Sequence, residues 1–369
     1  MTTAPAHEAE LVRAAQRGDE HAYRALMDAY RGELHAHCYR MLGSVHDAED
    51  ALQDAMLRAW RGLPRFQGAS SLRAWLYRIA TNTSLDIVGR RPKRVLPMDH
   101  VGPTDPRLGP GEPVTESVWL EPYPDETLAV ADGYATPEAR YEQRESVELA
   151  FVAALQHLPG RQRAVLILRE VLGFSASEVA ESLDTTVASV NSALQRARKT
   201  VDEKLPEQSQ QATLRELDDE QLREIVESYM KAMESGDVEA VMALLAEDAD
   251  WSMPPLPAWF TGADALRNFM HNGPLSGEWR WRHLSTQANG QPAVASYAWY
   301  EPDQAYRLFA LDVFTIEGAR IKSITSFINR STLSRDDLFY QRYPEQPVDD
   351  SNTSVNAESF GLPELLTDR

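Results

Sequence analysis

Apolar residues recur at intervals of three and four over residues 8–97, the spacing that gathers them on one face of an α-helix. The clearest run lies between Leu42 and Trp60, where leucine, alanine and methionine repeat in this way. The pattern breaks in the segment GLPRFQGASS at 62–71 and resumes as a second amphipathic helix from Leu72 to about Val88. These positions predict a small all-helical domain.

Residues 98–144 interrupt the helical pattern. Between Met98 and Arg140 lie nine acids, two arginines and prolines at 103, 106, 110, 113, 122, 124 and 137. Such a segment cannot bury enough apolar surface to order by itself, so it is predicted to be a flexible linker. Within it, WLEPYPD (Trp119–Asp125) sets two aromatic residues and a leucine among acids. This island either docks on a partner surface or is an adhesive piece of linker.

Two further patterned regions follow the linker. Helical spacing returns over 145–206, which predicts a second all-helical domain. Over 218–341 two helices, 219–233 and 237–246, precede strand-like stretches at 249–253, 278–287, 293–300, 305–317 and 320–329. Helices followed by strands predict an α+β layer. The tail, 342–369, is expected to be mostly disordered, with FGLPELL as a short docking element.

Charge is divided unevenly along the chain, whose formal net charge is −19. Nine arginines or lysines face one acid between Arg58 and Arg94, whereas 27 acids face 13 bases from Leu205 onward. Because phosphate binding draws on Lys and Arg, the basic segment keeps nucleic acid as a candidate partner despite the net charge. The opposed charges also favour an intramolecular contact of the C-terminal domain.

The sequence predicts a cytoplasmic protein without a bound cofactor or metal. The start lacks a secretory signal pattern, and no apolar run is long enough to span a bilayer, so no membrane partner is expected. Cys38 is the single cysteine, which excludes internal disulfides and multi-cysteine zinc clusters. His35 and His37 lie near it, but positions two apart on a helix do not face one another.

The segment Phe174–Lys199 carries the pattern of a helix-turn-helix. Ser175 and Glu178 have the spacing of a capping box, and Asp184-Thr185-Thr186 supply a turn and a new N-cap. The inward residues are expected to be Val179, Ala180, Leu183, Val187, Val190 and Leu194. The expected DNA-facing residues are Ser189, Asn191, Ser192, Gln195, Arg196, Arg198 and Lys199, joined by Arg169. Asn and Gln suit adenine and Arg suits guanine or phosphate in the major groove. A generic polar helical hairpin is the alternative.

Two segments in this order resemble the extracytoplasmic-function (ECF) sigma factors of the sigma-70 superfamily. LPGRQRAVLILREVLGFSASEVAESL…VASVNSALQRAR resembles their region four, which reads the minus-thirty-five element. DAEDALQDAMLRAW (47–60) resembles the polymerase-binding helix of region two, and RFQGASSLRAWLYRIATNTSLDIVGRR (65–91) resembles its minus-ten reading segment. The resemblance implies a region two helical bundle over 8–97 and a region four helix-turn-helix over 145–206.

The resemblance also implies residue roles. The minus-ten element would contact Arg65, Phe66, Gly68, Ser70, Arg73, Arg78, Asn82, Arg90 and Arg91, with Lys93 and Arg94 also against phosphate. Polymerase would contact Glu49, Asp50, Gln53, Asp54, Met56 and Leu57, through the clamp helices of its largest subunits. Trp75 and Ile79 are expected in the core. Met56 stands where the family often has an aromatic residue, and Asn191 and Ala193 replace a common arginine, so the promoter sequence cannot be transferred from relatives.

Residues 218–341 resemble the SnoaL-like members of the nuclear-transport-factor-two-like superfamily, cone-shaped α+β folds with an internal pocket. The resemblance lies in EIVESYMKAMESGDVEAVMALLAEDADWSMPP and FTIEGARIKSITSF. It implies a candidate small-molecule pocket at Trp251, Trp281, His283, Trp299 and Asp312. Asp250 is a further candidate acid, and Trp259, Tyr297 and Phe309 are further candidate walls. Aromatic residues at strand spacing usually belong to a core, and no two carboxylates pair by spacing, so catalysis is not expected.

The sequence therefore predicts a non-enzymatic transcription initiation factor that binds RNA polymerase core and promoter DNA, regulated in cis by its C-terminal domain. A second hypothesis makes that domain a working isomerase or hydrolase tethered to DNA. Loss of turnover in Asp312→Asn would favour this hypothesis. A third makes the chain a ligand-sensing repressor, which would bind an operator without co-purifying with core polymerase.

Overall fold

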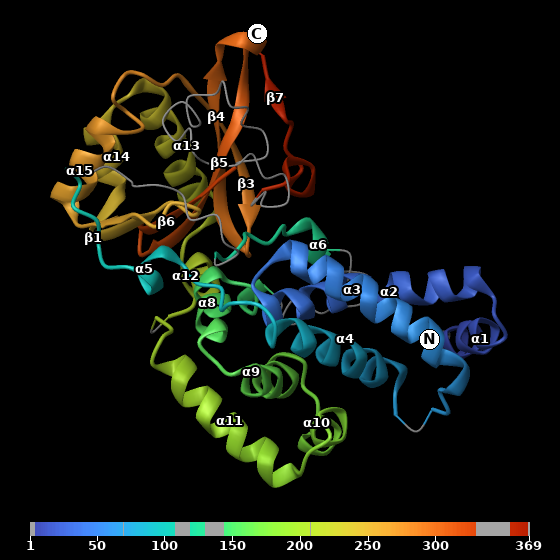
Figure 1. The fold of residues 1–369 in the computed structure, drawn as a ribbon. Coiled ribbons are helices and arrows are strands. Elements are labelled where there is room, and N and C mark those ends of the chain that lie inside the picture. The colour runs from blue at the N-terminus through green and yellow to red at the C-terminus, as the bar shows by residue number, and fades with distance from the viewer. Residues whose placement is uncertain are drawn as a thin grey trace. The chain divides into compact units, whose positions relative to one another are not determined.

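The computed structural model describes residues 4–68, 70–107, 119–129, 144–206, 208–329 and 355–367. The chain divides into two compact units. A helical unit contains residues 1–93 and 127–205, and a sheet unit contains 94–126 and 206–369 (Figure 1). The chain thus passes through the sheet unit once between the two helical modules and again after them.

The first module of the helical unit consists of α1 (Ala4–Gln16), α2 (Glu20–Leu42), α3 (Val45–Gly62), a 3-10 turn η1 (Leu63–Arg65) and α4 (Leu72–Val88). Polar caps set three of the helix starts, because Asp19, Ser44 and Ser71 accept hydrogen bonds from the first-turn amides of α2, α3 and α4. Gly43, at φ 69°, ends α2 in the left-handed conformation. The predicted helix, loop and helix between 42 and 88 are confirmed.

The second module contains α8 (Leu149–Gln156), α9 (Gly160–Leu166), a π-helical turn η2 (Ile167–Val171), α10 (Ala176–Ser182) and α11 (Val187–Asp202). It packs on the first module through buried hydrogen bonds. Arg40 on α2 donates to the carbonyl and hydroxyl of Ser146 at 3.1 and 2.6 Å. Arg163 on α9 donates to Gln156 Oε1 at 2.6 Å and to Met41 O. Burial lowers the pKa of Arg163 to about 10.

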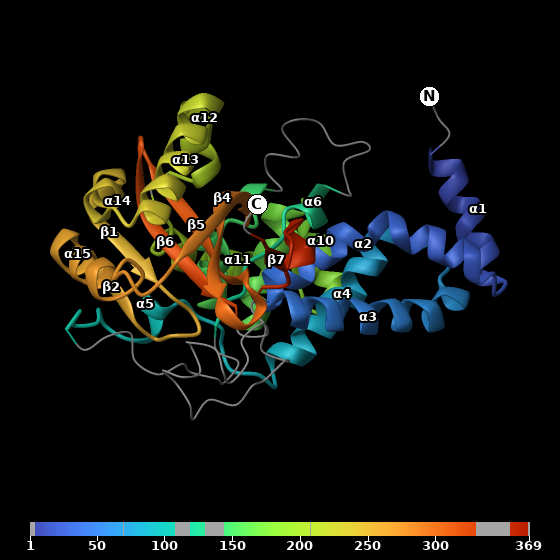
Figure 2. The ribbon, with the colours of Figure 1, turned by 90° about the horizontal axis from the view of Figure 1, so that it is seen from above.

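The sheet unit has helices α12 (Gln210–Glu216), α13 (Asp219–Ser235), α14 (Val238–Leu244) and α15 (Ala263–Asn272). Its strands are β1 (Leu245–Ser252), β2 (Trp259–Thr261), β3 (Trp281–Ala288), β4 (Gln291–Tyr300), β5 (Ala305–Glu317), β6 (Arg320–Ile328) and β7 (Leu365–Leu366). The strand order is β2-β1-β6-β5-β4-β3, and β7 pairs with β5. Helices α13, α14 and α15 cover one face of this curved sheet, as Figures 1 and 2 show from two directions.

The sheet departs from a simple meander. Strand β1 pairs in parallel with β6, while the pairs β3–β4, β4–β5 and β5–β6 are antiparallel. The main core lies between the sheet and its helices and includes Tyr229, Trp251, Phe260, Met270 and Phe314. The sequence pattern located α13, α14 and the long strands, but α12, α15 and the short strands β2 and β7 were not anticipated.

Part of the segment predicted to be a linker is instead bound to the sheet unit. Tyr123 is fully buried, and its backbone N–H donates to Asn289 Oδ1 at 2.9 Å. In return, the N–H of Asn289 donates to Tyr123 O at 2.8 Å, and Gly290 N–H donates to Asp125 Oδ1 at 2.8 Å. Leu120 and Trp119 are buried too, and Leu120 N–H donates to Val95 O at 3.1 Å. WLEPYPD therefore docks in cis on the β3–β4 turn, and we name residues 119–125 the clip.

The tail also contributes structure where the sequence favoured disorder. Residues 357–360 form a 3-10 turn, η5 (Ala357–Phe360), and Leu365 and Leu366 pair with Arg307 and Tyr306 of β5. Tyr297 OH donates to Pro363 O at 2.7 Å. FGLPELL is thus the docking element that its apolar residues indicated. Residues 330–354 lie outside the described part of the chain.

Candidate nucleic-acid interface

Helices α10 and α11 form the predicted helix-turn-helix. Ser175 Oγ accepts Glu178 N–H at 3.2 Å, and Glu178 Oε2 accepts Ser175 N–H at 2.7 Å, which makes a complete capping box. Asp184 takes a left-handed φ of 50°, and Thr186 Oγ1 caps α11 by accepting Ser189 N–H at 3.1 Å. The expected N-terminal signals therefore set the start of each helix.

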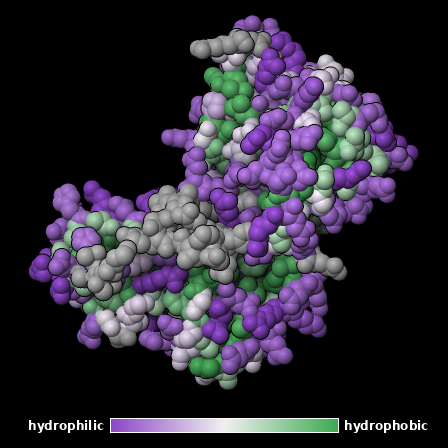
Figure 3. Space-filling view, turned by 180° about the vertical axis from the view of Figure 1, so that it is seen from behind, coloured by the Kyte–Doolittle hydropathy of each residue, from purple (hydrophilic) through white to green (hydrophobic). Residues whose placement is uncertain are grey.

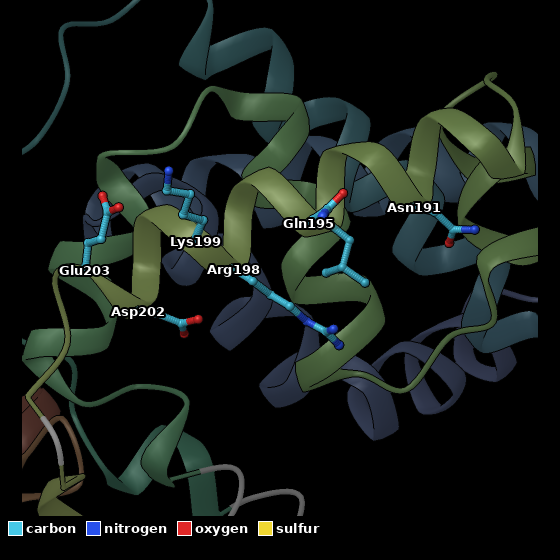
Figure 4. Close-up of a pocket in the computed structure, with 7 residues that line it drawn as sticks. Asn191, Gln195, Arg198, Lys199, Asp202 and Glu203 are labelled. Atoms are coloured by element: carbon cyan, nitrogen blue, oxygen red, sulfur yellow. The ribbon is translucent and has the colours of Figure 1, made fainter.

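The exposed face of α11 is polar and carries cations. Of the residues expected to face DNA, all those on α11 are exposed: Ser189, Asn191, Ser192, Gln195, Arg196, Arg198 and Lys199. Figure 4 shows the labelled side chains of Asn191, Gln195, Arg198 and Lys199 projecting from α11, beside a surface hollow of about 580 Å³. Asp202 and Glu203 line the same hollow at the C-terminal end of the helix. Since carboxylates repel phosphate, the N-terminal part of α11 is the better DNA-facing end.

Three residues near α11 differ from expectation or are already engaged. Val187 was expected inside, but it is 43% exposed at the first position of α11. Arg169 was expected to face DNA, but it is half-buried and donates to Phe174 O. Arg198 is paired with Glu170 on η2. Val187 was missed because helical spacing alone places it near the inward edge, whereas the first turn of a helix has no preceding turn to cover it.

The minus-ten candidates on the loop after α3 divide by exposure. Arg65 and Gly68 are exposed, while Phe66 and Ser70 are half-buried. The Phe66 ring lies 5.1 Å from the ring of Trp75 on α4. Trp75 and Ile79 were expected in the core and are half-buried.

The cationic candidates that follow are partly engaged inside the protein. Arg78, Asn82, Arg90, Arg91 and Lys93 are exposed, although Arg91 pairs with Asp47 and Lys93 Nζ lies 2.8 Å from His157 Nδ1. Arg73 pairs with Glu33 at 3.2 Å and lies over the rings of Tyr77 and Phe174 at 4.8 and 5.1 Å. This structure therefore turns Arg73 toward the second module rather than toward a phosphate.

Arg94 corrects another expected phosphate contact. It is 7% exposed, belongs to the sheet unit, and donates to Trp119 O at 2.8 Å and Glu121 Oε1 at 3.1 Å. Its guanidinium is thus used to hold the clip. The sequence could not distinguish this arginine from its neighbours, because its acidic partner lies in a different part of the chain.

Helix α3 presents the candidate polymerase surface. Asp50, Gln53, Asp54 and Leu57 are exposed, and Leu57 at 53% is among the few large apolar side chains exposed in the described residues. On the face drawn in Figure 3, hydrophilic side chains cover most of the surface, with hydrophobic areas in patches. Glu49 pairs with Arg31 at 2.8 Å, and Met56 is half-buried with its carbonyl accepting Tyr23 OH at 2.5 Å. An exposed leucine beside exposed polar residues fits a protein-binding surface.

Within the sheet unit, a buried row of polar groups crosses the helix-covered face of the sheet. Asp312 on β5 is 3% exposed, and its Oδ2 accepts Tyr229 OH at 3.1 Å and Ser296 Oγ–H at 2.8 Å. Ser326 lies directly opposite Asp312 on β6, and His283 lies opposite Ser296 on β3. Burial raises the pKa of Asp312, while the surrounding hydroxyl donors oppose that rise.

Trp251 and His283 belong to this row. Trp251 Nε1 donates to Ser326 Oγ at 2.9 Å. The His283 side chain is fully buried, and neither ring nitrogen makes a hydrogen bond among the described residues. Its Nδ1 lies 3.5 Å from Glu234 Oε1, which instead accepts the His283 backbone N–H at 2.8 Å. Trp281 packs beside His283 with ring centroids 6.2 Å apart.

Trp299 and Tyr297 are corrections to the candidate pocket. Trp299 is half-buried and donates to Glu301 Oε2 at 2.6 Å, with Arg280 over its ring at 4.3 Å. Tyr297 bonds to the tail, and neither residue joins the core cluster beneath the helices. Side chains alternate along β4, whose pairing with β3 is continuous here, so Tyr297 and Trp299 lie on the opposite face from Ser296 and the polar row.

The remaining pocket candidates have structural partners. Trp259 Nε1 donates to Val101 O at 2.8 Å, and Phe309 packs on Trp281 at 5.5 Å. Asp250 is half-buried on β1, and burial raises its pKa. Trp251, Trp281, His283 and Asp312 are therefore the candidates that the fold gathers on one face.

Neither a metal site nor a membrane span is found in the described part of the chain. Among the described residues, no group of three His, Cys, Asp or Glu side chains is arranged to hold a metal ion. His37 and Cys38 are fully buried, and burial lowers the pKa of His37 to about 3 and raises that of Cys38 to about 12. No helix within the described ranges has the length and apolar character needed to cross a membrane.

The geometry defines a helix-turn-helix protein with a second helical module and an added α+β domain, and comparison with known proteins agrees. Sigma-70 region 2 matches residues 26–94, Sigma-70 region 4 matches 148–201, and the SnoaL-like domain matches 226–324. The ECF RNA polymerase sigma factor SigG of Mycobacterium tuberculosis is 41% identical over 315 residues, covering 85% of this chain and 82% of that protein. SigW of Bacillus subtilis is 29% identical over 197 residues, covering 53% of this chain and 94% of that protein.

A solved structure is similar in fold. The crystal structure of the extracytoplasmic-function sigma factor SigJ of Mycobacterium tuberculosis matches with a TM-score of 0.53 at 20% identity, covering 88% of this chain and 99% of that one. The chain belongs to the ECF RNA polymerase sigma factors and carries a SnoaL-like C-terminal domain. The resemblance drawn from the sequence is confirmed, and with it the class of fold.

Proposed function

We propose that this sigma factor uses α3 to bind the polymerase clamp, the η1–α4 loop with α4 to open the minus-ten element, and α11 to read the minus-thirty-five element. The protein then acts in the cytoplasm, where polymerase and promoter are found. The exposed polar face of α11 is the observation that supports this most directly. Its residues from Val187 to Lys199 include three bases and no acid, and the N-terminal end of a recognition helix is the part that reaches base edges.

Promoter binding requires the two helical modules to separate. The minus-ten and minus-thirty-five elements lie about 25 base pairs apart, roughly 85 Å at about 3.4 Å per pair. The 23 residues of α2, the longest helix of the unit, extend about 35 Å at 1.5 Å per residue. The hydrogen bonds of Arg40 and Arg163 between the modules therefore belong to a closed form, which polymerase and DNA must open.

We infer that the C-terminal domain regulates this opening through the chain that joins the modules. The clip lies between α4 and α8 in sequence but is bound to the β3–β4 turn by Asn289 and Asp125. While the clip is docked, less of the connecting chain is free to let the modules move apart. Release of the clip would lengthen the undocked chain between α4 and α8. The C-terminal domain would therefore control the separation of the modules through the fraction of protein in which the clip is docked.

The C-terminal domain is proposed to be regulatory rather than catalytic. Asp312 is held by hydroxyl groups, and the other candidate acid, Asp250, lies on β1 and not in the polar row. A buried carboxyl that accepts several hydroxyl donors is a satisfied structural group. The tethered isomerase or hydrolase remains the second candidate, supported by the buried His283 ring, which makes no hydrogen bond among the described residues and interacts electrostatically with that carboxyl.

Run-off transcription with purified core polymerase tests the proposal. The full-length chain should bind core and direct initiation on DNA selected by the holoenzyme. A chain ending at Leu205 should bind core equally well but differ in transcript yield, because the clip then has no partner. Absence of core binding by the full-length chain would refute the sigma assignment of these surfaces. Equal transcript yields from the full-length and shortened chains would refute cis-regulation but not the sigma assignment.

A further inference from the structure

The loop that follows η1 is held by a residue that lies outside the matched sigma-70 region 2. Gln16, the last residue of α1, donates its side-chain amide to Phe66 O at 2.8 Å and to Leu63 O at 3.2 Å. The match begins at residue 26, so α1 lies outside the matched range. A glutamine amide carries two hydrogens, which lets one side chain serve both carbonyls.

These two carbonyls bracket the turn that starts the loop. Phe66 N–H donates to Leu63 O at 3.0 Å and closes the turn from within. Gln16 closes it from outside, because its amide spans the same two residues. The main chain at Phe66 is thereby fixed relative to α1 rather than only to its own neighbours in sequence.

The side chain of Phe66 is held separately, from the direction of α4. Its ring lies 5.1 Å from Trp75, at an interplanar angle of 39°. Trp75 in turn lies against Gly62, where a Cβ would approach its Cζ2 to 3.1 Å. A larger residue at 62 would displace the indole. The loop thus starts from a residue fixed by main-chain bonds on one side and by ring contact on the other.

The residues beyond Phe66 are less constrained. Gln67 and Gly68 are exposed, and Gly68 adopts a left-handed φ of 72°. The next fixed point is Ser71, whose hydroxyl caps α4 by accepting Ala74 N–H at 3.1 Å. A loop that is anchored at Phe66 and Ser71 and exposes Gln67 and Gly68 can receive a base that has left the stack. Fixing its ends in advance removes part of the ordering cost of binding.

We propose that Gln16 is a positioning residue for promoter melting, holding the Leu63–Phe66 turn so that the following loop is preformed to accept an unstacked base of the minus-ten strand. The proposal rests on the proposed function of this loop. It predicts that Gln16 acts on melting and base discrimination and not on polymerase affinity, because its hydrogen bonds go to Leu63 and Phe66, beyond the exposed polymerase candidates of α3.

The test compares Gln16→Leu, which keeps the volume but loses both donors, with Tyr30→Phe. Tyr30 OH donates to Glu8 Oε2 at 2.5 Å and ties α1 to α2 without touching the loop, so it is the matched control. Both full-length proteins are assembled with core polymerase on promoter DNA selected by the wild-type holoenzyme. Permanganate reactivity of minus-ten thymines reports the melting rate, and single abasic positions locate the base that the wild type reads.

Gln16→Leu should melt the promoter about tenfold more slowly, as expected for losing two neutral hydrogen bonds. The affinity of Gln16→Leu for core polymerase should equal that of the wild type. Tyr30→Phe should match the wild type in both melting rate and core affinity. At the abasic position that most slows the wild type, the difference between Gln16→Leu and wild type should disappear, because there is no base for the loop to hold. If Gln16→Leu proves thermally unstable, Gln16→Glu replaces it, since its carboxylate faces two carbonyl oxygens and should impair melting at least as much.

Three results would overturn the proposal: wild-type melting by the Gln16 variant, an equal loss in Tyr30→Phe, or a defect that persists unchanged on the abasic template. The last two would assign the effect to general docking of α1. Failure of the proposed function of the loop would show differently. The wild-type protein itself would then melt every abasic minus-ten template as fast as the intact promoter.

Discussion

Replacing Asn289 by glycine removes one of the hydrogen bonds that hold the clip, the one that its side chain accepts. Asn289 sits at φ 57°, which glycine adopts without strain, so the β3–β4 turn should persist. Its backbone N–H still donates to Tyr123 O. What disappears is the Oδ1 acceptor 2.9 Å from the Tyr123 N–H, in a site where Asn289 is fully buried.

The size of the effect follows from that burial. A donor left unsatisfied inside a protein costs about 1–3 kcal/mol. At about 1.4 kcal/mol per tenfold, the docked population of the clip should fall roughly fivefold to a hundredfold relative to the undocked one. The sheet core should be little affected, because the hydrophobic cluster under α13, α14 and α15 does not include the clip.

Hydrogen exchange in the full-length protein measures this directly. Amides of residues 119–125 should lose protection by the factor given above, while those of β5 and β6 keep theirs. Asn272→Ala is the control, since Asn272 is exposed and its side chain bonds only within α15, to Asn268. Unchanged protection of the clip, or loss spread evenly over the sheet, would refute the reasoning. Promoter output by the Asn289→Gly holoenzyme should differ from wild type at equal core affinity.

Three other predictions concern helix α3, helix α11 and the buried polar row of the sheet unit. Leu57→Ala should weaken core binding tenfold or more in a pull-down titration but change unfolding by less than about 0.5 kcal/mol, whereas Leu52→Ala, buried on the same helix, should cost about 2–5 kcal/mol. Gln195→Ala should lose about 1–3 kcal/mol of binding free energy on selected DNA only, and an equal loss on unrelated DNA would contradict base reading by Gln195. Lys199→Ala should weaken binding to all DNA similarly and lower the salt slope of binding by about one. Because burial raises the pKa of Asp312 above its unfolded value, its contribution to stability is full below the unfolded pKa and is lost as pH rises through the folded pKa, so Asp312→Asn should flatten that decline in thermal melts.

The sequence alone determined the features that depend on local chemistry. Capping by Ser175, Thr186 and Ser71 starts helices within one turn, so their spacing could be recognised without knowledge of the fold. The outward face of α11 followed from helical periodicity in the same way, and so did the order of two helical modules and an α+β domain. Periodicity failed at Val187, where the end of a helix leaves an inward-spaced residue uncovered.

Only the tertiary structure decided where the charged and aromatic residues of the connecting segment lie. Arg94 continues a basic run in sequence, yet it is buried against Trp119 and Glu121. Tyr123 belongs to a proline-rich stretch, yet its backbone N–H donates to Asn289, which lies 166 residues away in the sequence. Gln16 likewise reaches the carbonyls of Leu63 and Phe66 only because α1 packs beside that turn. Such partners meet through the packing of distant segments, and a pattern within one segment carries no record of them.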